Sequence, residues 1–374
     1  MDCIHYLDEL CKGAAVSGYE ETFARKISAI FSKYCDDVET DTMFNVIGKK
    51  GAELQDEGTL KQNEGTLKKE EALGIKPFNT KPLNIMVLSH YDEIGLVIKS
   101  IDDKGFLKFA CIGGIDRKIL PAAEVVIHGT KDMPKDIPGV IGAKPPHLLQ
   151  SDESRKVPVI DDMSIDTGLD VNTVKKYISI GDIATFKCTP FVLNNKRYSS
   201  KSLDNRCGVA AQILIMKELY NIRHRNNIYF IATVQEEVDS LAGARAAAYK
   251  LKPDIAVVID ACHGDMPEAP KDECFSIGKG PAIAIGPNIK KKYAQLLINI
   301  ARNENIPFQI DVEPGDTGTE AWATQVSRAG IPTVLVSVPV RYMHTPVETA
   351  DIKDIENTAK LIAKFIISAG KTEV

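Results

Sequence analysis

The sequence lacks three features that would each point to a different class of protein. It has no run of about 18 apolar residues, so it predicts no membrane-spanning helix. It has no excess of positive charge, because 46 lysines and arginines stand against 51 aspartates and glutamates, a formal net charge of −5. A basic surface for nucleic acid is therefore not expected. Its first residues, MDCIHYLDELCKG, combine acids with a helical spacing and do not follow the basic-then-apolar plan of a signal peptide.

The eight cysteines include no CxxC pair, and the gaps between them are irregular. They stand at positions 3, 11, 35, 111, 188, 207, 262 and 274. In a chain with no signal peptide plan, this usage is typical of reduced, mostly buried thiols. We therefore expect a cytoplasmic protein.

The order of predicted strands and helices indicates an α/β protein of two domains. From residue 203 onward, apolar strands alternate with helices, a pattern typical of a mixed sheet covered by helices on both faces. Residues 95–195 instead hold short β-like runs between Gly, Pro and Asp turns, which favours a small β-barrel or sandwich. With 374 residues, the chain is long enough for two domains. We predict a discontinuous α/β domain, 1–98 and 189–374, with a β-rich domain, 99–188, inserted into it.

Residues 50–81 differ from the rest of the chain. They are polar, rich in Glu, Lys and Gly, and they contain the pentapeptide EGTLK twice, at 57–61 and 64–68. Two short copies are too few to build a repeat structure. We interpret the segment as a solvated insertion in a hairpin, mobile or partly helical. The alternative is an element that projects from the body and serves assembly or gating.

Acidic and histidine residues stand near the ends of several apolar runs. The candidate positions are His90 with Asp92 after 84–90, Asp204 at the opening of helix 207–220, the pair Glu236 and Glu237 after 226–234, Asp260 at the end of 254–260, and His344 after 333–339. Each alone has an ordinary explanation, such as a solvated helix start, a helix cap or a packed loop histidine. Together they predict a cluster at one edge of the sheet. Carboxylates and imidazoles are the ligands that zinc, cobalt and manganese accept.

Six segments of the sequence resemble the M42 family of metallo-aminopeptidases, of the glutamyl-aminopeptidase and tetrahedral-aminopeptidase type. They are SHYDEIG (89–95), SLDNRCG (202–208), VQEEV (234–238), VVID (257–260), IGKGPAI (277–283) and VPVRYMHTPVE (338–348). Their order and spacing agree with the family over most of the chain. The resemblance implies a zinc-peptidase-like fold. It also implies that the inserted β domain helps subunits associate, as a homo-oligomer ranging from a dimer to a hollow dodecamer.

The resemblance also implies a role for each candidate residue. His90, Asp204, Glu237, Asp260 and His344 would bind two divalent metal ions per subunit. These ions would be zinc or cobalt, with manganese as a further possibility. Asp204 would bridge the two ions, and Asp92 would orient His90. A metal-bridged hydroxide would attack the first peptide bond of a peptide with a free N-terminus, with Glu236 as the general base.

Several positions depart from the family pattern. The family's Gly-Leu-Arg-Gly-Ala after the Glu pair is replaced by a longer loop, 239–244, that begins with Asp239 and has no Arg. His263 is an additional histidine near the site, for which a loop role is the simpler interpretation, and Glu320 stands where the family has Asp. None of these changes removes a predicted ligand, so we expect an intact metal site with altered specificity or rate.

Two other functions fit the same residues. An M20-like metallo-carboxypeptidase or deacylase shares the order of ligands, but its inserted domain usually follows the Glu pair, whereas here the insertion precedes Asp204. A scaffold of the same fold could bind ligands without catalysis. Metal content and hydrolysis separate these alternatives from an aminopeptidase.

Overall fold

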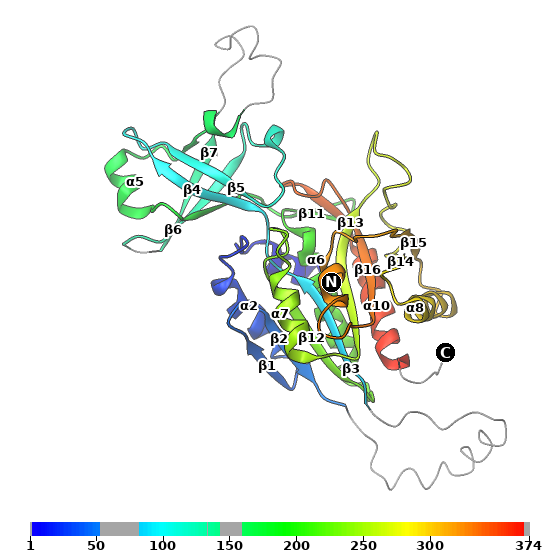
Figure 1. The fold of residues 1–374 in the computed structure, drawn as a ribbon. Coiled ribbons are helices and arrows are strands. Elements are labelled where there is room, and N and C mark those ends of the chain that lie inside the picture. Colours follow the sequence, from blue (N-terminus) through cyan, green and yellow to red (C-terminus); the bar gives the residue numbers. More distant parts are fainter. Residues whose placement is uncertain (1, 53–81, 133, 143–158, 370–374) are drawn as a thin grey trace, which may run out of the picture.

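The computed structural model describes residues 2–52, 82–132, 134–142 and 159–369. The polar insertion predicted at 50–81 therefore lies, from residue 53 onward, outside the described residues. The described part consists of a large mixed sheet with helices on both faces and a separate closed barrel (Figure 1). This confirms the predicted α/β class and the β-barrel-like insertion.

The large sheet has 11 strands, and its central strands are parallel. The main path runs β1-β2-β12-β3-β13-β16-β17-β11-β10, and β14 joins β15 and β16 beside it. The strands are β1 (Asp37–Thr40), β2 (Val46–Lys50), β3 (Asn84–His90), β10 (Phe191–Leu193), β11 (Arg197–Ser200), β12 (Asn227–Thr233), β13 (Ile255–His263), β14 (Ala282–Ile285), β15 (Gln309–Val312), β16 (Thr333–Arg341) and β17 (Glu348–Asp351). Strands β12, β3, β13 and β16 pair in parallel. Their apolar sequences fit this position, since strands buried on both faces carry near-continuous apolar runs.

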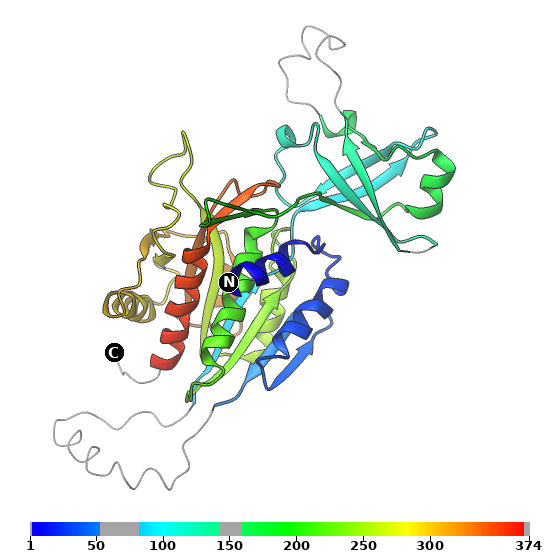
Figure 2. The same cartoon turned by 180° about the vertical axis from the view of Figure 1, so that it is seen from behind.

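Helices cover both faces of this sheet. They are α1 (Asp2–Cys11), α2 (Glu21–Phe31), α6 (Leu203–Leu219), α7 (Ala242–Leu251), α8 (Lys291–Asn303), α9 (Glu320–Gln325) and α10 (Ile352–Ser368). Helices α6 and α10 pack against each other and, together with α1, lie in front of the sheet when the molecule is seen from behind (Figure 2). Helix α7 lies on the opposite face and contacts β12 and α9. The central strands are therefore enclosed, and only their ends reach solvent.

Six antiparallel strands close the barrel in the order β4-β5-β8-β7-β6-β9. The barrel elements are β4 (Gly95–Ile101), β5 (Leu107–Ile112), η1 (Arg117–Ile119), β6 (Glu124–Gly129), β7 (Lys135–Ile141), η3 (Ile160–Asp162), β8 (Ile165–Asp166), α5 (Val171–Tyr177) and β9 (Ile183–Phe186). The barrel has an apolar core of its own and projects from one end of the large sheet (Figures 1 and 2). It begins directly after β3, so the chain leaves the sheet beside His90 and returns before Asp204.

One predicted strand boundary was wrong. The sequence placed the end of the strand at Asp260, but β13 continues to His263. The extension follows from pairing, because β13 keeps its parallel register with β16 as far as His263 opposite Val340. Asp260 therefore lies within a strand, paired with Ser337 of β16, whereas the pairing of β13 with β3 ends at Val258. In the part of the chain that the structure describes, no helix has the length and apolar character needed to cross a membrane.

Candidate metal centre

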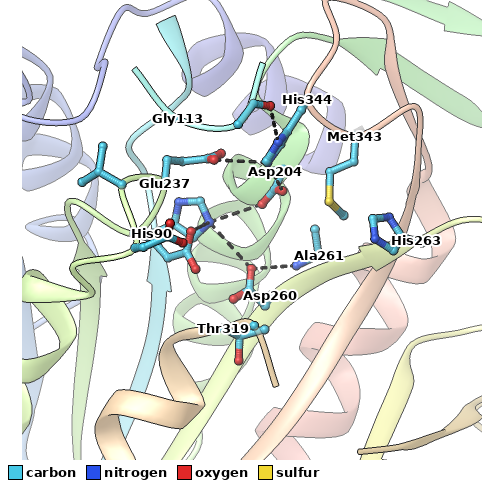
Figure 3. Close-up of a pocket in the computed structure, with 15 residues that line it drawn as sticks. His90, Gly113, Asp204, Glu237, Asp260, Ala261, His263, Thr319, Met343 and His344 are labelled. Carbon is cyan, nitrogen blue, oxygen red and sulfur yellow. Dashed lines mark hydrogen bonds and ion pairs between the residues drawn. The ribbon is translucent and has the colours of Figure 1, made fainter. Parts of the chain in front are cut away.

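The predicted site residues meet at the carboxyl ends of the central parallel strands. His90 is the last residue of β3, Glu236 and Glu237 follow β12, Asp260 lies in β13, and His344 follows β16. Because β12, β3, β13 and β16 are adjacent and parallel, these ends form one edge of the sheet. Figure 3 shows His90, Asp204, Glu237, Asp260 and His344 directed toward the same cavity. The structure brings together all the residues that the sequence singled out.

Asp204 reaches this edge from the opening of α6. The backbone of Asp204 and Asn205 is not helical, with Asp204 at φ −77° and ψ 106°. The Asp204 amide donates a hydrogen bond to the Glu348 carboxylate at 3.0 Å. Glu348 thus holds the backbone of Asp204, and the Asp204 side chain points toward the two histidines.

Each carboxylate oxygen of Asp204 faces a different histidine. Oδ1 lies 3.2 Å from Nε2 of His90, and Oδ2 lies 3.6 Å from Nε2 of His344. Each histidine also faces at least one further carboxylate, and His90 faces Glu236 as well, at 3.8 Å from its Oε2. His90 Nε2 lies 3.7 Å from Oδ1 of Asp260, and His344 Nε2 lies 3.1 Å from Oε2 of Glu237. Asp204 therefore contacts both histidines, with Asp260 and Glu236 beside His90 and with Glu237 beside His344.

Asp92 fixes the floor of the site. Its Oδ1 lies 3.4 Å from His90 Nδ1 and accepts the Glu236 amide at 3.1 Å. Its Oδ2 accepts the Glu237 amide at 3.2 Å and the Ser17 hydroxyl at 2.6 Å. One buried carboxylate therefore orients a histidine through the nitrogen that faces away from the cavity, and also holds the backbone of the Glu pair.

Two groups that orient His344 were not predicted. The Glu348 carboxylate accepts the His344 amide at 2.9 Å in addition to the Asp204 amide, so it joins two chain segments of the site. The Gly114 carbonyl, from the barrel, lies 2.8 Å from His344 Nδ1. Glu348 stands four residues after His344 in the HTPVE segment, which was a usable signal. Nothing in the sequence pointed to a backbone carbonyl 230 residues away.

Several acidic and histidine side chains of the site have pKa values well above their ordinary values. Burial raises the pKa of Asp260 well above its ordinary value, and it raises the pKa of Glu236 to about 9. Hydrogen bonds that His344 donates to the carboxylates of Asp204 and Glu237 raise its pKa to about 11. Burial opposes protonation of His90, but the surrounding carboxylates, with Glu236 first, raise its pKa well above the ordinary value. A buried excess of carboxylates of this kind needs positive charge to balance it.

The donor set fits divalent cations. Ligand atoms of His90, Asp204 and Glu237 lie within 4.8 Å of one another, and so do those of His90, Glu236 and Asp260. Asp260 Oδ2 is buried without a hydrogen-bond partner in the described residues, although it borders the cavity. Imidazole nitrogens and carboxylate oxygens are ligands that zinc, cobalt and manganese share.

The cavity above this floor has a volume of about 530 Å³. Its lining residues are His90, Gly113, Gly114, Asp204, Glu236, Glu237, Val238, Asp239, Asp260, Ala261, His263, Gly318, Thr319, Met343 and His344. The His90 side chain is 1% exposed and that of His344 34% exposed, so the site runs from a closed floor to an open mouth. His263 is exposed, borders the cavity and belongs to neither ligand group.

Glu320 lies behind the cavity rather than on its wall. It is fully buried, and neither carboxylate oxygen has a hydrogen-bond partner in the described residues. Burial raises its pKa to about 8. The longer side chain at this position therefore adds a polar group to the interior without entering the cavity.

The chain is similar to known aminopeptidases along nearly its whole length. The model of the M42 glutamyl aminopeptidase family matches residues 72–361. The lysyl aminopeptidase of Pyrococcus furiosus is 30% identical, with 95% of this chain and 94% of the relative covered. The aminopeptidase APDkam598 of the archaeon Desulfurococcus kamchatkensis superposes with a TM-score of 0.84 at 32% identity, covering 98% of this chain and 95% of that one. The TET1 peptidase of Pyrococcus horikoshii gives a TM-score of 0.79 at 30% identity, covering 98% and 99%.

The fold and the cluster at the strand ends thus define a peptidase with a histidine–carboxylate centre. The chain belongs to the M42 peptidase family, and it is a peptide hydrolase. This agrees with the resemblance found in the sequence, and it favours an aminopeptidase over the M20-like alternative.

Proposed function

We propose that this protein is a two-metal aminopeptidase that removes the first residue from peptides with a free N-terminus. The observation that carries the proposal is the position of Asp204, whose two oxygens face His90 and His344 separately. A carboxylate placed in this way could serve as a ligand of two cations at once, as in two-metal hydrolases.

Two positions for the ions follow from these contacts. One ion would be held by His90, Asp260 and Oδ1 of Asp204, and the other by His344, Glu237 and Oδ2 of Asp204. Bound zinc, cobalt or manganese would polarise the peptide carbonyl and lower the pKa of a water molecule. Asp92, Glu348 and the Gly114 carbonyl would keep the ligand side chains in place, since each contacts a ligand residue without being a ligand.

Glu236 would act as the general base and then as the general acid. Its Oε2 lies 3.8 Å from His90 Nε2, and its side chain, 15% exposed, borders the cavity. Its amide is held by Asp92, and among the described side chains its carboxylate has only the long ion pair with His90. It would take a proton from the attacking water and deliver it to the nitrogen of the leaving peptide.

The assembly and the environment of the protein are also proposals. The P. horikoshii TET1 peptidase assembles into a tetrahedron or an octahedral shell, which supports a homo-oligomer for this chain. We further propose that 1–98 and 189–374 form the catalytic domain and that the inserted domain, 99–188, carries contacts between subunits. All eight cysteines lie in described residues and are free thiols, as a cytoplasmic location requires.

The test is hydrolysis of matched peptides with free and N-acetylated first residues. We expect release of the first amino acid from the free peptides only, loss of activity with a chelator, and recovery with Zn²⁺, Co²⁺ or Mn²⁺. The Asp204→Ala variant should bind less than the wild-type amount of both ions, measured by elemental analysis. Cleavage from the carboxyl end, or removal of acyl groups, would replace the proposal with a carboxypeptidase or deacylase. A metal-free, inactive protein would support a binding scaffold.

A further inference from the structure

Asp239 is fixed at the wall of the cavity by a tight turn that follows the Glu pair. Its amide donates to the Glu236 carbonyl at 3.0 Å, and the next residue, Ser240, donates its hydroxyl to the Gln235 carbonyl at 3.0 Å. The turn is anchored further by the Gly243 amide, which donates to Val234. Asp239 is exposed and belongs to the cavity lining. The Asp239 carboxylate is thus attached to a turn whose backbone is held by hydrogen bonds to residues 234–236, which include Glu236.

The backbone at Asp239 has a φ of +58°, in the left-handed region. Glycine adopts this region without cost, whereas a residue with a side chain is less favourable there, although Asp tolerates it better than most. The Asp239 carboxylate makes no ion pair with any of the described residues. The position therefore carries a charged side chain that contributes no visible bond to the fold.

The charge balance of the cavity isolates this carboxylate. No Lys or Arg is present among the described lining residues. The carboxylates of Asp204, Glu237 and Asp260 face the two histidines, whereas the exposed carboxylate of Asp239 contacts neither of them. Asp239 is therefore the carboxylate of the cavity wall that remains available to a ligand. A cationic group entering the cavity would find its partner there, since opposite charges across a half-enclosed site attract more strongly than in bulk water.

We infer that Asp239 selects peptides whose first residue has a cationic side chain, lysine or arginine. The inference rests on the proposed aminopeptidase function and adds the substrate class to it. Val238 and Met343, also in the cavity lining, offer apolar surface to the methylene stem of such a side chain. The family match leaves this preference open, because its model is described as glutamyl aminopeptidase while a relative is named lysyl aminopeptidase.

The experiment compares tripeptides that differ only in their first residue. Lys-Ala-Ala and norleucine-Ala-Ala have the same stem, and only lysine has the terminal ammonium group. The ratio of their kcat/KM values therefore isolates the charge. We expect the wild-type enzyme to prefer lysine, and the Asp239→Asn variant to lower the ratio about tenfold, between the effect of an exposed ion pair and that of a desolvated one. Added salt should lower the wild-type ratio and leave that of the variant nearly constant.

Three further variants separate the effect of the charge from a folding defect. Asp239→Gly removes the charge and suits the left-handed backbone, so it should fold at least as stably as the wild type while losing the lysine preference. Asp239→Lys should shift the preference toward Glu-Ala-Ala. Asp103→Asn, an exposed residue in the turn between β4 and β5, is the matched charge control and should leave the ratio unchanged.

The possible outcomes test the inference separately from the proposed aminopeptidase function on which it rests. If the wild type cleaves the tripeptides without favouring lysine, or if Asp239→Asn keeps the ratio, the inference is wrong and the aminopeptidase function stands. If Asp239→Asn slows all substrates equally, Asp239 contacts the α-amine common to them, and the inference is again wrong. If the metal-loaded wild type cleaves none of the tripeptides, the proposed function itself fails.

Discussion

The Glu348 carboxylate is the clearest example of a single side chain that organises this centre. It is 2% exposed and accepts one amide from Asp204 and one from His344, residues that lie 140 positions apart in the chain. Asp92 plays the same part for His90 and the Glu pair. The ligands are thus held by carboxylates that bind backbone amides.

Glu348→Ala should weaken metal binding without removing a ligand. The change leaves two buried amides without an acceptor, at a cost of roughly 1–3 kcal/mol each, and frees Asp204 and His344 to shift. We expect metal affinity to fall about 10- to 100-fold, the usual effect of removing a group that orients a ligand. Competition with a chelating dye measures it. Glu348→Gln keeps one acceptor oxygen and should recover part of the loss, whereas equal affinity in all three proteins would contradict the role.

Glu236→Gln should abolish most of the activity while retaining the metals. The amide cannot take a proton from water, so kcat should fall by about 10²- to 10⁴-fold, the usual share of a general base. Metal content by elemental analysis should equal that of the wild type, because neither proposed ion position uses this side chain. A variant that keeps wild-type turnover would show that another group is the base.

At the scale of elements, a loop of the barrel completes a site built on the sheet. The loop between β5 and η1 brings the Gly114 carbonyl to His344 Nδ1, which fixes the proton on that nitrogen and leaves Nε2 facing Asp204 and Glu237. A Cβ at Gly114 would lie 3.0 Å from His344 Nδ1, closer than nearly all such contacts. Barrel and sheet therefore meet at His344, one of the proposed metal ligands.

Gly114→Ala should displace His344 and lower metal affinity roughly tenfold at the position that uses it. Titration of the metal-free protein should show one weakened step and one unchanged step. Gly142→Ala is the matched control, since Gly142 also lies in the barrel region and a Cβ there would meet no atom of the described residues within 4 Å. Identical titrations for both variants would show that the loop does not position the histidine.

The elements also show how far the sequence could go. The sequence predicted the five apolar runs of the barrel and the four central strands. In these segments apolar residues either alternate with polar ones or form short continuous runs, and both patterns are typical of strands. The extension of β13 past Asp260 was not, because it depends on pairing with β16 and on no property of its own residues. The opening of α6 at Leu203, with Asp204 outside helical geometry, likewise depends on Glu348 rather than on local preference.

At the scale of the whole molecule, one buried ion network ties the N-terminal segment to the site. Glu93, 2% exposed, accepts hydrogen bonds from Lys201 and Ser202, contacts Arg206 at 3.3 Å and accepts the Ala15 amide at 2.9 Å. Burial opposes its charge, but attraction to Lys201 and Arg206 is stronger and lowers its pKa to about 2. The network joins the two segments that carry His90 and Asp204, because Glu93 follows His90 in the chain while Ser202 and Arg206 flank Asp204.

This network predicts a pH dependence of stability. The pKa of Glu93 is lower in the folded state, about 2, than its ordinary value of 4.5, so its stabilisation is complete above pH 4.5 and is lost as the pH falls toward 2. The contribution is on the order of 3 kcal/mol. Unfolding of the metal-free wild type and Glu93→Gln should differ most near neutral pH and converge below pH 3. A difference that persists unchanged in acid would mean that the charge of Glu93 is not the source.

The sequence by itself determined the family, the fold class and the seven polar positions of the site, His90 to His344. It could do so because these residues lie in short segments at the ends of apolar strands, and the order and spacing of the segments together indicate one site. Only the tertiary structure decided which oxygen of Asp204 faces which histidine, and that Glu348, the Gly114 carbonyl and the turn at Asp239 complete the cavity. These contacts join residues far apart in the chain, and their geometry is fixed by the packing of the sheet, the helices and the barrel together.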